Sequence, residues 1–290
     1  FVVTQRCNNE CTYCHASSLD ENISQKYDMD VKTARKCVDL AFNSPSQHIK
    51  IEFQGGDPLL AFEPVKNIVE YSQELNETAK KDLDFVICTN LTTITSAQMD
   101  YLKENNIFIS TSFDGPHEIH DACRKTRRGT GTYDAVIKNL SWAMETLGRD
   151  KVSALTTVTP YNVHRLREVI DEYLKQGLSS IFLRMINPYG AAFKNWNNLG
   201  YSIDEFVKNY KDALEYIIQI NMSGQYFPEE FATLLLTKIM TPFSTGFVDL
   251  QSPTGAGIGG VIYEINGDVF MADEARMLAK MNGDMSFCIG

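Results

Sequence analysis

Strand-like and helix-like segments alternate regularly through the first part of this chain, and this order restricts the possible folds more than any other feature. Six short apolar runs are predicted strands, at residues 1–4, 48–54, 84–89, 107–113, 152–158 and 180–186. Amphipathic stretches with helical spacing lie between them, near residues 30–43, 62–78, 95–105, 132–148 and 162–176. Strands that alternate with helices favour parallel pairing through right-handed crossovers. Because six strands are too few for a closed eight-stranded barrel, we expect an α/β fold, a partial (β/α)6 barrel of the TIM type.

The last third of the chain has a different pattern. We predict a loop at residues 188–200, followed by helices at 202–222 and 229–241. Further on, Asn266-Gly267 separates the apolar runs VIYEI and DVFMA, and Asn-Gly between two such runs is a strong hairpin signal. We therefore expect three parts: a barrel, a helical connector and a small C-terminal β-hairpin module, at residues 1–200, 201–245 and 246–290. Since Phe1 already lies inside a predicted strand, we expect a fragment of a longer protein, cut at both ends.

The composition argues against several classes of partner. The formal net charge is −10, whereas binding to a phosphate backbone needs a basic surface, so we expect no nucleic-acid partner. No apolar run approaches the length of a membrane span and no secretory signal is visible, so we expect no membrane partner. The chain has seven cysteines, an odd number, and three of them are clustered. This pattern fits metal ligation in a reducing cytoplasm better than a disulfide framework.

The clustered cysteines are Cys7, Cys11 and Cys14, which follow the first predicted strand with the spacing Cys-x3-Cys-x2-Cys. Three thiolates on one short loop can hold three corners of a cubane iron–sulfur cluster and leave the fourth iron open to another ligand. Other interpretations remain open at this point. Cys11-Thr12-Tyr13-Cys14-His15 also matches the Cys-x-x-Cys-His haem attachment motif, which leaves Cys7 without a role. A Cys3His zinc site is a third possibility, although His15 directly follows Cys14, and buried structural cysteines are a fourth.

Polar and glycine residues follow the other predicted strands. In parallel α/β folds, ligands bind at the carboxyl ends of the strands. These ends read Gln54-Gly55-Gly56-Asp57-Pro58, Cys88-Thr89-Asn90, Ser112-Phe113-Asp114-Gly115-Pro116 and Arg184. Each segment alone is more often a turn than a site. Together, downstream of the cysteine loop, they predict one ligand pocket.

These motifs resemble the radical S-adenosylmethionine superfamily, whose cofactors are a [4Fe-4S] cluster and S-adenosylmethionine (AdoMet). The resemblance implies that Cys7, Cys11 and Cys14 bind the cluster. It implies that the remaining matched positions contact AdoMet, namely Tyr13, Gly55, Gly56, Asp57, Pro58, Asn90, Ser112, Asp114, Arg124 and Leu183. Within this set, the segment from Gly55 to Pro58 is expected to hold the methionine amino group, and Arg124 is expected near the carboxylate. Asp57 stands where the family usually has Glu, which keeps the charge but shortens the reach.

Two further segments resemble the branch of this superfamily that modifies peptides and proteins. Residues 112–124 and 129–140 are similar to those of peptide-modifying enzymes, which include the anaerobic sulfatase-maturing enzymes. Residues 251–277 are similar to those of maturases of His-Xaa-Ser systems and related peptide cyclases, which carry a C-terminal SPASM or twitch module. The resemblance implies an oxidoreductase that uses a 5′-deoxyadenosyl radical to take hydrogen from a ribosomally made precursor peptide and form a side-chain crosslink. Its expected electron donor is a low-potential flavodoxin or ferredoxin. The alternatives are formylglycine formation on a sulfatase and, in another class, a haem or iron–sulfur electron carrier.

The C-terminal module departs from the family pattern. Its usual cysteines would fall at positions 254 and 272, which are Thr254 and Ala272 here, although the expected Gly267 is present. Thr and Ala do not replace thiolates as ordinary cluster ligands, so an auxiliary iron–sulfur cluster is in doubt. The next residue, Asp273, matches the position of the catalytic base in the sulfatase-maturing relatives, and its alternative is an ordinary exposed hairpin acid.

Overall fold

The computed structural model describes residues 1–251 and 255–290, and the chain divides into two compact units. Unit 1 contains residues 1–8, 16–109 and 256–290, and unit 2 contains residues 9–15 and 110–255. The predicted ligand position Thr254 lies outside the described residues.

Among residues 1–251 and 255–290, six strands form one parallel sheet in the order β1-β4-β5-β6-β7-β8. Their bounds are Val2–Thr4 (β1), His48–Gly55 (β4), Asp82–Thr89 (β5), Phe108–Ser112 (β6), Val152–Val158 (β7) and Phe182–Met185 (β8). The division between the units falls within β6. The spatial order follows the chain order, as successive crossovers of one hand produce. The predicted six-stranded α/β architecture is confirmed, with each strand within three residues of its predicted ends.

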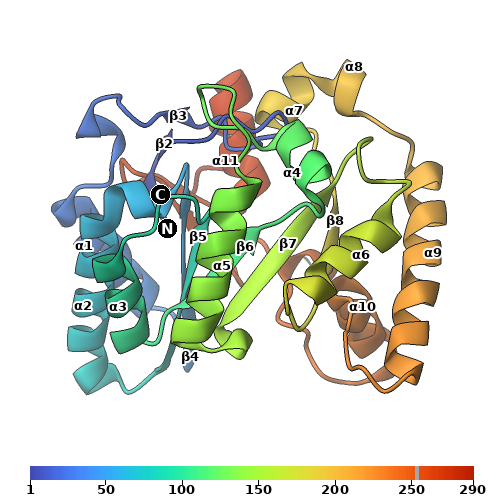
Figure 1. The fold of residues 1–290 in the computed structure, drawn as a ribbon. Coiled ribbons are helices and arrows are strands. Elements are labelled where there is room, and N and C mark those ends of the chain that lie inside the picture. Colours follow the sequence, from blue (N-terminus) through green and yellow to red (C-terminus); the bar gives the residue numbers. More distant parts are fainter. Residues whose placement is uncertain (252–254) are drawn as a thin grey trace. The chain divides into compact units, whose positions relative to one another are not determined.

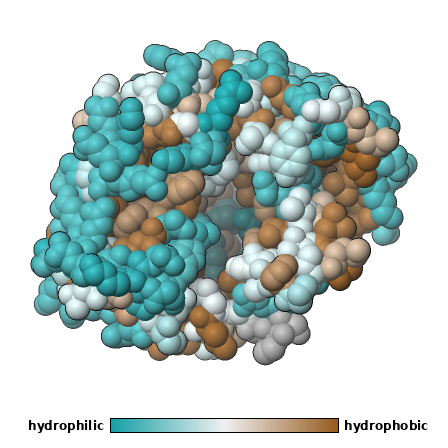
Figure 2. Space-filling view, turned by 90° about the horizontal axis from the view of Figure 1, so that it is seen from below, coloured by the Kyte–Doolittle hydropathy of each residue, from teal (hydrophilic) through white to brown (hydrophobic). Residues whose placement is uncertain are grey.

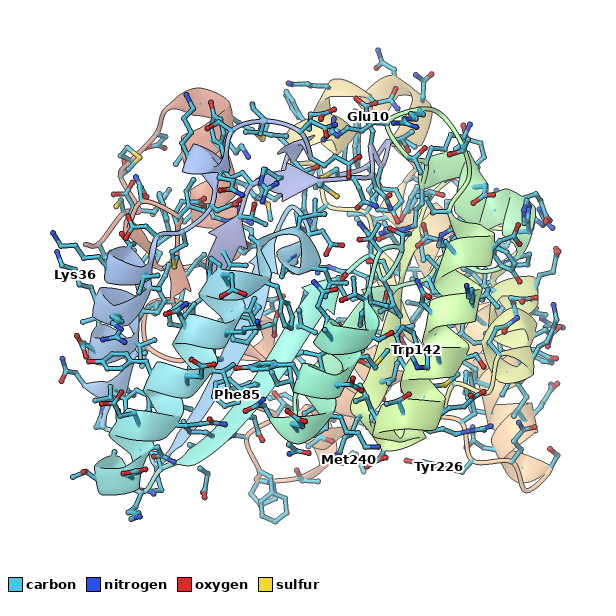
Figure 3. The ribbon with its side chains drawn as sticks, turned by 60° about the vertical axis from the view of Figure 1, so that its left-hand side comes forward. Glu10, Lys36, Phe85, Trp142, Tyr226 and Met240 are labelled. Atoms are coloured by element: carbon cyan, nitrogen blue, oxygen red, sulfur yellow. The ribbon has the colours of Figure 1, made fainter. Side chains whose placement is uncertain are left out.

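In unit 1, three helices cover one face of the strands (Figure 1): α1 (Val31–Phe42), α2 (Phe62–Ala79) and α3 (Ser96–Glu104). Phe53 of β4 and Phe85 of β5 stack there with ring centroids 6.3 Å apart, and both are buried. Lys36 of α1 points outward, as expected for the polar face of an amphipathic helix (Figure 3). Because side chains alternate along a strand, Glu52 and Cys88 lie on the opposite face from this core. Cys88 is half-buried and lies outside this helix-covered core, and its thiol donates to Glu52 Oε1 over 3.3 Å.

Unit 2 contains the remaining barrel helices: α4 (His117–Cys123), α5 (Tyr133–Leu147) and α6 (Leu166–Lys175). Tyr173 of α6 is buried, and its hydroxyl donates to the Phe113 carbonyl over 2.7 Å. Two long helices follow the last strand, α9 (Ile203–Met222) and α10 (Glu230–Met240). In Figure 1, α9 lies beside α6. Both helices confirm the predicted segments 202–222 and 229–241.

The segment 188–200 was predicted as a loop, and this prediction is wrong. It forms two short helices, α7 (Gly190–Lys194) and α8 (Trp196–Leu199). The physical reason is burial, because Ala192 and Leu199 pack into an apolar cluster with Tyr13, Cys123 and Ile186. Short helices of this kind carry too few apolar residues for their spacing to be recognised in the sequence.

In unit 1, the C-terminal segment forms the predicted hairpin and then a helix that the sequence pattern did not reveal. Strands β9 (Ile262–Tyr263) and β10 (Val269–Phe270) pair antiparallel across Asn266-Gly267. Helix α11 (Asp273–Asn282) follows directly. Asp273 is thus the first residue of a helix, and its description as an exposed hairpin acid is wrong.

Helix α10 exposes hydrophobic side chains along most of its length, including Leu236, Ile239 and Met240. Helix α10 lies in the lower part of the view in Figure 1. Figure 2 shows the molecule from below that view, and hydrophobic residues lie among hydrophilic ones on this face. Figure 3 shows Met240 and Tyr226 at the lower edge of the view. In the described residues, no helix is both long and apolar enough to cross a membrane.

Glu229 joins α10 to the last strand of the sheet. It is buried and caps the helix by accepting the Ala232 N–H over 2.6 Å. It also accepts the Leu183 N–H of β8 over 3.0 Å and the Tyr210 hydroxyl of α9. Burial raises the pKa of Glu229, and these donors offset part of that effect. One carboxyl therefore connects three elements of unit 2.

We predict that Glu229→Ala lowers the free energy of unfolding by about 2–4 kcal/mol, because a helix cap is lost and buried donors lose their acceptor. The matched control is Glu230→Ala, the next residue in the same helical turn, with an expected loss below about 1 kcal/mol. Urea unfolding followed by circular dichroism measures both values. Equal losses in the two variants would contradict the role of Glu229.

Candidate active site

The cysteine loop is anchored at several backbone positions. Cys7 ends the short strand β2 (Arg6–Cys7) in unit 1, whereas Cys11 and Cys14 belong to unit 2. In unit 2, the Cys14 N–H donates to the Cys11 carbonyl over 3.1 Å, and the Thr12 N–H donates to the Cys123 carbonyl over 3.0 Å. The Ala191 N–H of α7 donates to the Cys14 carbonyl over 2.8 Å. The short helix that the sequence did not reveal therefore holds one end of the predicted cluster loop.

The three cysteines of this loop form no disulfide bond. Burial raises the pKa of the Cys11 thiol to about 11, and the nearby Arg124 guanidinium opposes this shift. An uncharged thiol is the expected state of a buried cysteine without metal. Binding to a metal deprotonates such a thiol, because the cation stabilises the thiolate.

In unit 1, Asp57 holds together the ends of β4 and β5. Its carboxylate is completely buried. Oδ1 accepts the Leu59 N–H over 3.0 Å, Oδ2 accepts the Asn90 N–H over 2.8 Å, and the Thr89 hydroxyl lies 2.9 Å from both oxygens. Each oxygen thus accepts at least one backbone N–H. This arrangement favours a positioning role for Asp57 over direct contact with the amine of a ligand.

Asn90 connects this carboxylate to the cysteine loop. Its side-chain amide donates to Asn8 Oδ1 over 2.8 Å and to the Cys7 sulfur over 3.6 Å. Hydrogen bonds to the sulfur ligands of a cluster influence its reduction potential. Asn90 was predicted as a contact of AdoMet, and the structure places it beside a predicted cluster ligand.

Gly55 and Gly56 allow two backbone segments to approach closely. A Cβ atom on Gly55 would lie 2.0 Å from the Thr4 carbonyl oxygen, and one on Gly56 would lie 2.0 Å from the Arg6 carbonyl oxygen. The Gly56 N–H donates to Thr4 and the Asp57 N–H donates to Arg6. These hydrogen bonds pack the end of β4 against β1 and β2. The carbonyl oxygens of Gly55 and Gly56 have two lone pairs each and can still accept from a ligand.

Pro58 follows as the first residue of the 3-10 helix η2 (Pro58–Ala61), where its missing N–H has no cost.

The remaining predicted residues on the sheet are Ser112 and Leu183. Ser112 is the last residue of β6 and is half-buried. Leu183 of β8 is the register partner of Thr156 on β7. The Thr156 hydroxyl bonds the Phe113 carbonyl and the Tyr173 hydroxyl on the helix-covered face.

In unit 2, Tyr13, Asp114 and Arg124 form a buried hydrogen-bonded group. The Tyr13 hydroxyl donates to Asp114 Oδ2 over 2.5 Å and accepts from Arg124 Nη1 over 2.6 Å. The Thr157 N–H donates to Asp114 Oδ1 over 3.1 Å. Burial raises the pKa of Asp114, while the Arg124 guanidinium and the Tyr13 hydrogen bond oppose this. Three predicted residues from distant positions in the sequence are therefore brought together.

Arg124 has an unsatisfied donor. The guanidinium is buried, and its Nε has no hydrogen-bond partner among the described residues. Buried donors without a partner are rare and require an explanation, such as a ligand that the group binds. A carboxylate is the group that a guanidinium binds best.

His120 was not predicted as a site residue, but it connects Asp114 to Arg124. Its Nδ1 accepts the Asp114 N–H over 3.3 Å. Its Nε2 lies 3.1 Å from the Thr132 hydroxyl, which donates to the Arg124 carbonyl over 2.8 Å. Burial lowers the pKa of His120 well below its usual range, so the ring is neutral at pH 7. No spacing signal in the sequence identifies such a residue, because its partners are set by tertiary packing.

These observations test whether the expected cofactors fit. In unit 1, the Asn90 side-chain amide directed at Cys7 fits a cluster ligand. In unit 2, Cys11 and Cys14 form no disulfide and fit cluster ligands, and the Arg124 Nε, without a partner among the described residues, fits the carboxylate of AdoMet. An auxiliary cluster does not fit the C-terminal segment. Ala272 has no ligand atom, and Cys288 is the one cysteine between residues 255 and 290.

The predicted base Asp273 lies in unit 1 within a group of charged residues on the C-terminal segment. Its Oδ1 accepts from Arg276 Nε over 3.0 Å and from Nη2 over 2.7 Å. Arg276 Nη1 lies 3.6 Å from Glu264 Oε2. The Asp273 carboxylate is thus oriented by a guanidinium one helical turn away.

The family model described as the radical SAM superfamily matches residues 1–173. An uncharacterized protein of Methanocaldococcus jannaschii is 31% identical over 75% of this chain and 71% of its own length. The cysteine-type anaerobic sulfatase-maturating enzyme of Clostridium perfringens is 28% identical over 80% of this chain and 64% of the enzyme. Radical SAM cyclopropyl synthase TigE of Paramaledivibacter caminithermalis is 26% identical over 74% of this chain and 45% of the synthase. The chain therefore spans less than two thirds of either enzyme.

Two solved structures show the same fold. Native anSMEcpe with bound AdoMet superposes with a TM-score of 0.75 and 21% identity, over 99% of this chain and 81% of that one. Streptococcus suis SuiB bound to precursor peptide SuiA gives a TM-score of 0.64 and 14% identity, over 97% and 60%. These matches confirm the predicted fold class.

We predict that Asp57→Asn lowers the free energy of unfolding by about 2–3 kcal/mol. Both carboxylate oxygens accept a backbone N–H, so either orientation of the asparagine amide leaves one N–H facing another donor. The control is Asp84→Asn, half-exposed at the other end of β5, with an expected change below about 1 kcal/mol. Urea denaturation tests both, and an unchanged stability of Asp57→Asn would contradict the described network.

We also predict a pH-dependent effect of Tyr13→Phe. Because the pKa of Asp114 is raised on folding, this carboxyl stabilises the folded state at low pH, and the contribution is lost as the pH rises through the folded-state pKa. The Tyr13 hydroxyl stabilises the ionised form. Its removal should therefore cost about 1.5–3 kcal/mol near pH 7.5 and less near pH 4.

Thermal and urea unfolding at the two pH values measure this difference. Tyr161→Phe, an exposed position in unit 2, is the control and should show no pH-dependent change. A loss for Tyr13→Phe that is equal at both pH values would contradict the role of its hydroxyl at Asp114.

Proposed function

Because this chain belongs to the radical SAM superfamily, we propose that it modifies a ribosomally made peptide by forming a side-chain crosslink. As a member of that superfamily it is an enzyme that uses a [4Fe-4S] cluster and AdoMet. The residues proposed to bind the cluster are Cys7, Cys11 and Cys14. The specific substrate and reaction are our proposal, since the chain spans only part of its characterised relatives.

The structural observation that supports AdoMet binding, on which the proposed reaction depends, is the group around Arg124. Tyr13 stands between Cys11 and Cys14 in the sequence, and its hydroxyl accepts a hydrogen bond from this guanidinium. The unsatisfied Arg124 Nε then offers a donor to the carboxylate of AdoMet. A link of this kind places the carboxylate-binding group beside the loop that is expected to bind the cluster.

The bound cluster and AdoMet supply a one-electron reductive cleavage that produces a radical able to take a hydrogen atom from carbon. The chain's own residues hold and tune these groups. Asn90 donates to the sulfur of Cys7, and Asp57 holds the Asn90 backbone. Arg124 and Tyr13 orient the carboxylate end of AdoMet.

A peptide substrate is supported by the relatives. The similar proteins include sulfatase-maturating enzymes and the cyclopropyl synthase TigE, and SuiB shares the fold and is bound to a precursor peptide. A crosslink removes two hydrogens from the peptide. One leaves as a hydrogen atom, and the other leaves as a proton and an electron. We propose that Asp273 accepts this proton and that a low-potential carrier of the flavodoxin or ferredoxin type exchanges electrons with the enzyme.

Formylglycine formation is a second candidate, favoured by the 28% identity to a cysteine-type anaerobic sulfatase-maturating enzyme. Its product contains an aldehyde, whereas a crosslink does not. The family match argues against haem attachment at Cys11-Thr12-Tyr13-Cys14-His15, because the same cysteines belong to the cluster motif.

We predict that the chain, reconstituted with iron and sulfide under anoxia, converts AdoMet to 5′-deoxyadenosine when dithionite is added. The variant with Cys7, Cys11 and Cys14 all replaced by alanine should lose this activity by at least about 100-fold, because no thiolates remain to bind the cluster. Cys288→Ala, outside the motif, is the control and should retain it. Liquid chromatography quantifies the product, and activity in the triple variant would refute the cluster assignment.

Synthetic peptides rich in Cys, Ser and aromatic residues then separate the two reactions. A crosslinked product loses two hydrogens and does not react with a hydrazide probe. A formylglycine product reacts with the probe, and it also loses sulfur when it derives from cysteine. Hydrazide-reactive products alone would contradict the proposed crosslink.

A further inference from the structure

In unit 1, helix α11 contacts one end of the cysteine loop directly and the other end through Glu264 of the hairpin. On one side, Lys280 Nζ donates to the Ala16 carbonyl over 2.7 Å, and Ala16 lies two residues after Cys14. On the other side, Gln5, two residues before Cys7, donates to Glu264 Oε1 over 2.9 Å. Glu264 in turn interacts with Arg276 of α11. One helix therefore reaches the residues that enter and leave the loop.

The contacts of Arg276 form a buried network. Its side chain is 5% exposed, and it lies between the carboxylates of Asp273 and Glu264, which are 24% and 11% exposed. Separating a buried guanidinium from one of its two carboxylates is costly, because it leaves a buried charge without compensation. Arg276 thus connects the N-terminal part of α11 to Glu264 of the hairpin.

The hairpin that carries Glu264 is itself attached to the first strand. The Tyr263 ring of β9 packs against the Phe1 ring with a centroid distance of 4.6 Å. The Phe1 amino group donates to the Glu52 carbonyl of β4 over 2.8 Å. The C-terminal segment is therefore joined to the sheet through its aromatic residues as well as its charges.

The two ends of the loop also pair with each other. β2 and β3 (Leu19–Asp20) are parallel, with Arg6 opposite Leu19 and Cys7 opposite Asp20. The Leu19 N–H donates to the Gln5 carbonyl over 2.7 Å. These strands have only two residues each and few hydrogen bonds, so on their own they are weak. Additional contacts are needed to fix the spacing of the loop ends.

We propose that α11 is a brace for the two unit-1 segments that flank the cluster-binding loop, and that Arg276 and Lys280 are positioning residues for Gln5–Cys7 and for Ala16. This inference rests on the proposed function, in which the loop binds the cluster. It explains how the C-terminal segment can be fixed without metal, because Ala272 stands directly before α11 where a cysteine ligand was expected. Ion pairs and a lysine–carbonyl hydrogen bond hold this segment instead.

The test uses Lys280→Met and Gln5→Leu, which remove the hydrogen bonds to Ala16 and to Glu264 and approximately keep side-chain volume. Arg276→Met is avoided as the main variant, because two buried carboxylates would lose their partner. The matched control is Lys238→Met, an exposed lysine on α10. Each variant is examined first without metal and then after reconstitution with iron and sulfide.

In the metal-free protein, we predict that amide hydrogen exchange of residues 15–20 becomes about fivefold faster in Lys280→Met and in Gln5→Leu, and about 25-fold faster in the double variant. Exchange in α2 and in the control variant should not change. After reconstitution, a chelator should remove iron about fivefold faster from each single variant, because the loop opens more often.

Unchanged exchange in residues 15–20 together with unchanged iron loss would overturn the brace. Faster exchange of equal size in α2 would also overturn it, because the contacts would then support unit 1 as a whole. Both measurements are independent of AdoMet cleavage. If the unmodified protein fails to form 5′-deoxyadenosine, the proposed function fails, while the exchange data still decide whether α11 braces the loop.

Discussion

The close approach of backbone segments at the end of β4 is the constraint on which unit 1 depends. Gly55 and Gly56 leave no room for a Cβ atom against the Thr4 and Arg6 carbonyls, and their neighbour Asp57 is buried as a consequence. A buried carboxylate must be fully hydrogen-bonded. Asp57 meets this requirement with donors from η2 and from the end of β5, and this places Asn90 next to Cys7. Strand packing, charge burial and the expected cluster ligand are therefore physically coupled.

Unit 2 also buries charged side chains, here as an oppositely charged pair. Arg124 and Asp114 are both buried, and the Tyr13 hydroxyl lies between them as acceptor for one and donor for the other. His120, kept neutral by burial, ties their backbones together without adding charge. Within the part of the chain that the structure describes, the Arg124 Nε of this group has no partner, and an anionic ligand would satisfy it. Such a site is prepared for binding at the expense of stability.

The C-terminal segment shows how a fold can keep its geometry when expected metal ligands are absent. Ala272 does not supply a ligand, and the adjacent helix is fixed by Arg276 between Asp273 and Glu264. Asp273 is consequently oriented by its ion pair with Arg276. The same network reaches Gln5 and so connects the segment with the cysteine loop.

The sequence by itself determined the order of strands and helices, since hydrophobic periodicity is a local property that each segment carries alone. It also determined the family, because Cys7, Cys11 and Cys14 keep a fixed spacing on one short loop. Only the tertiary structure decided what Asp57, Asn90 and His120 do, because their partners come from distant segments and hydrogen bonding depends on distance and burial. It alone revealed α7, α8 and α11, whose short apolar faces gain stability only from the surfaces on which they pack.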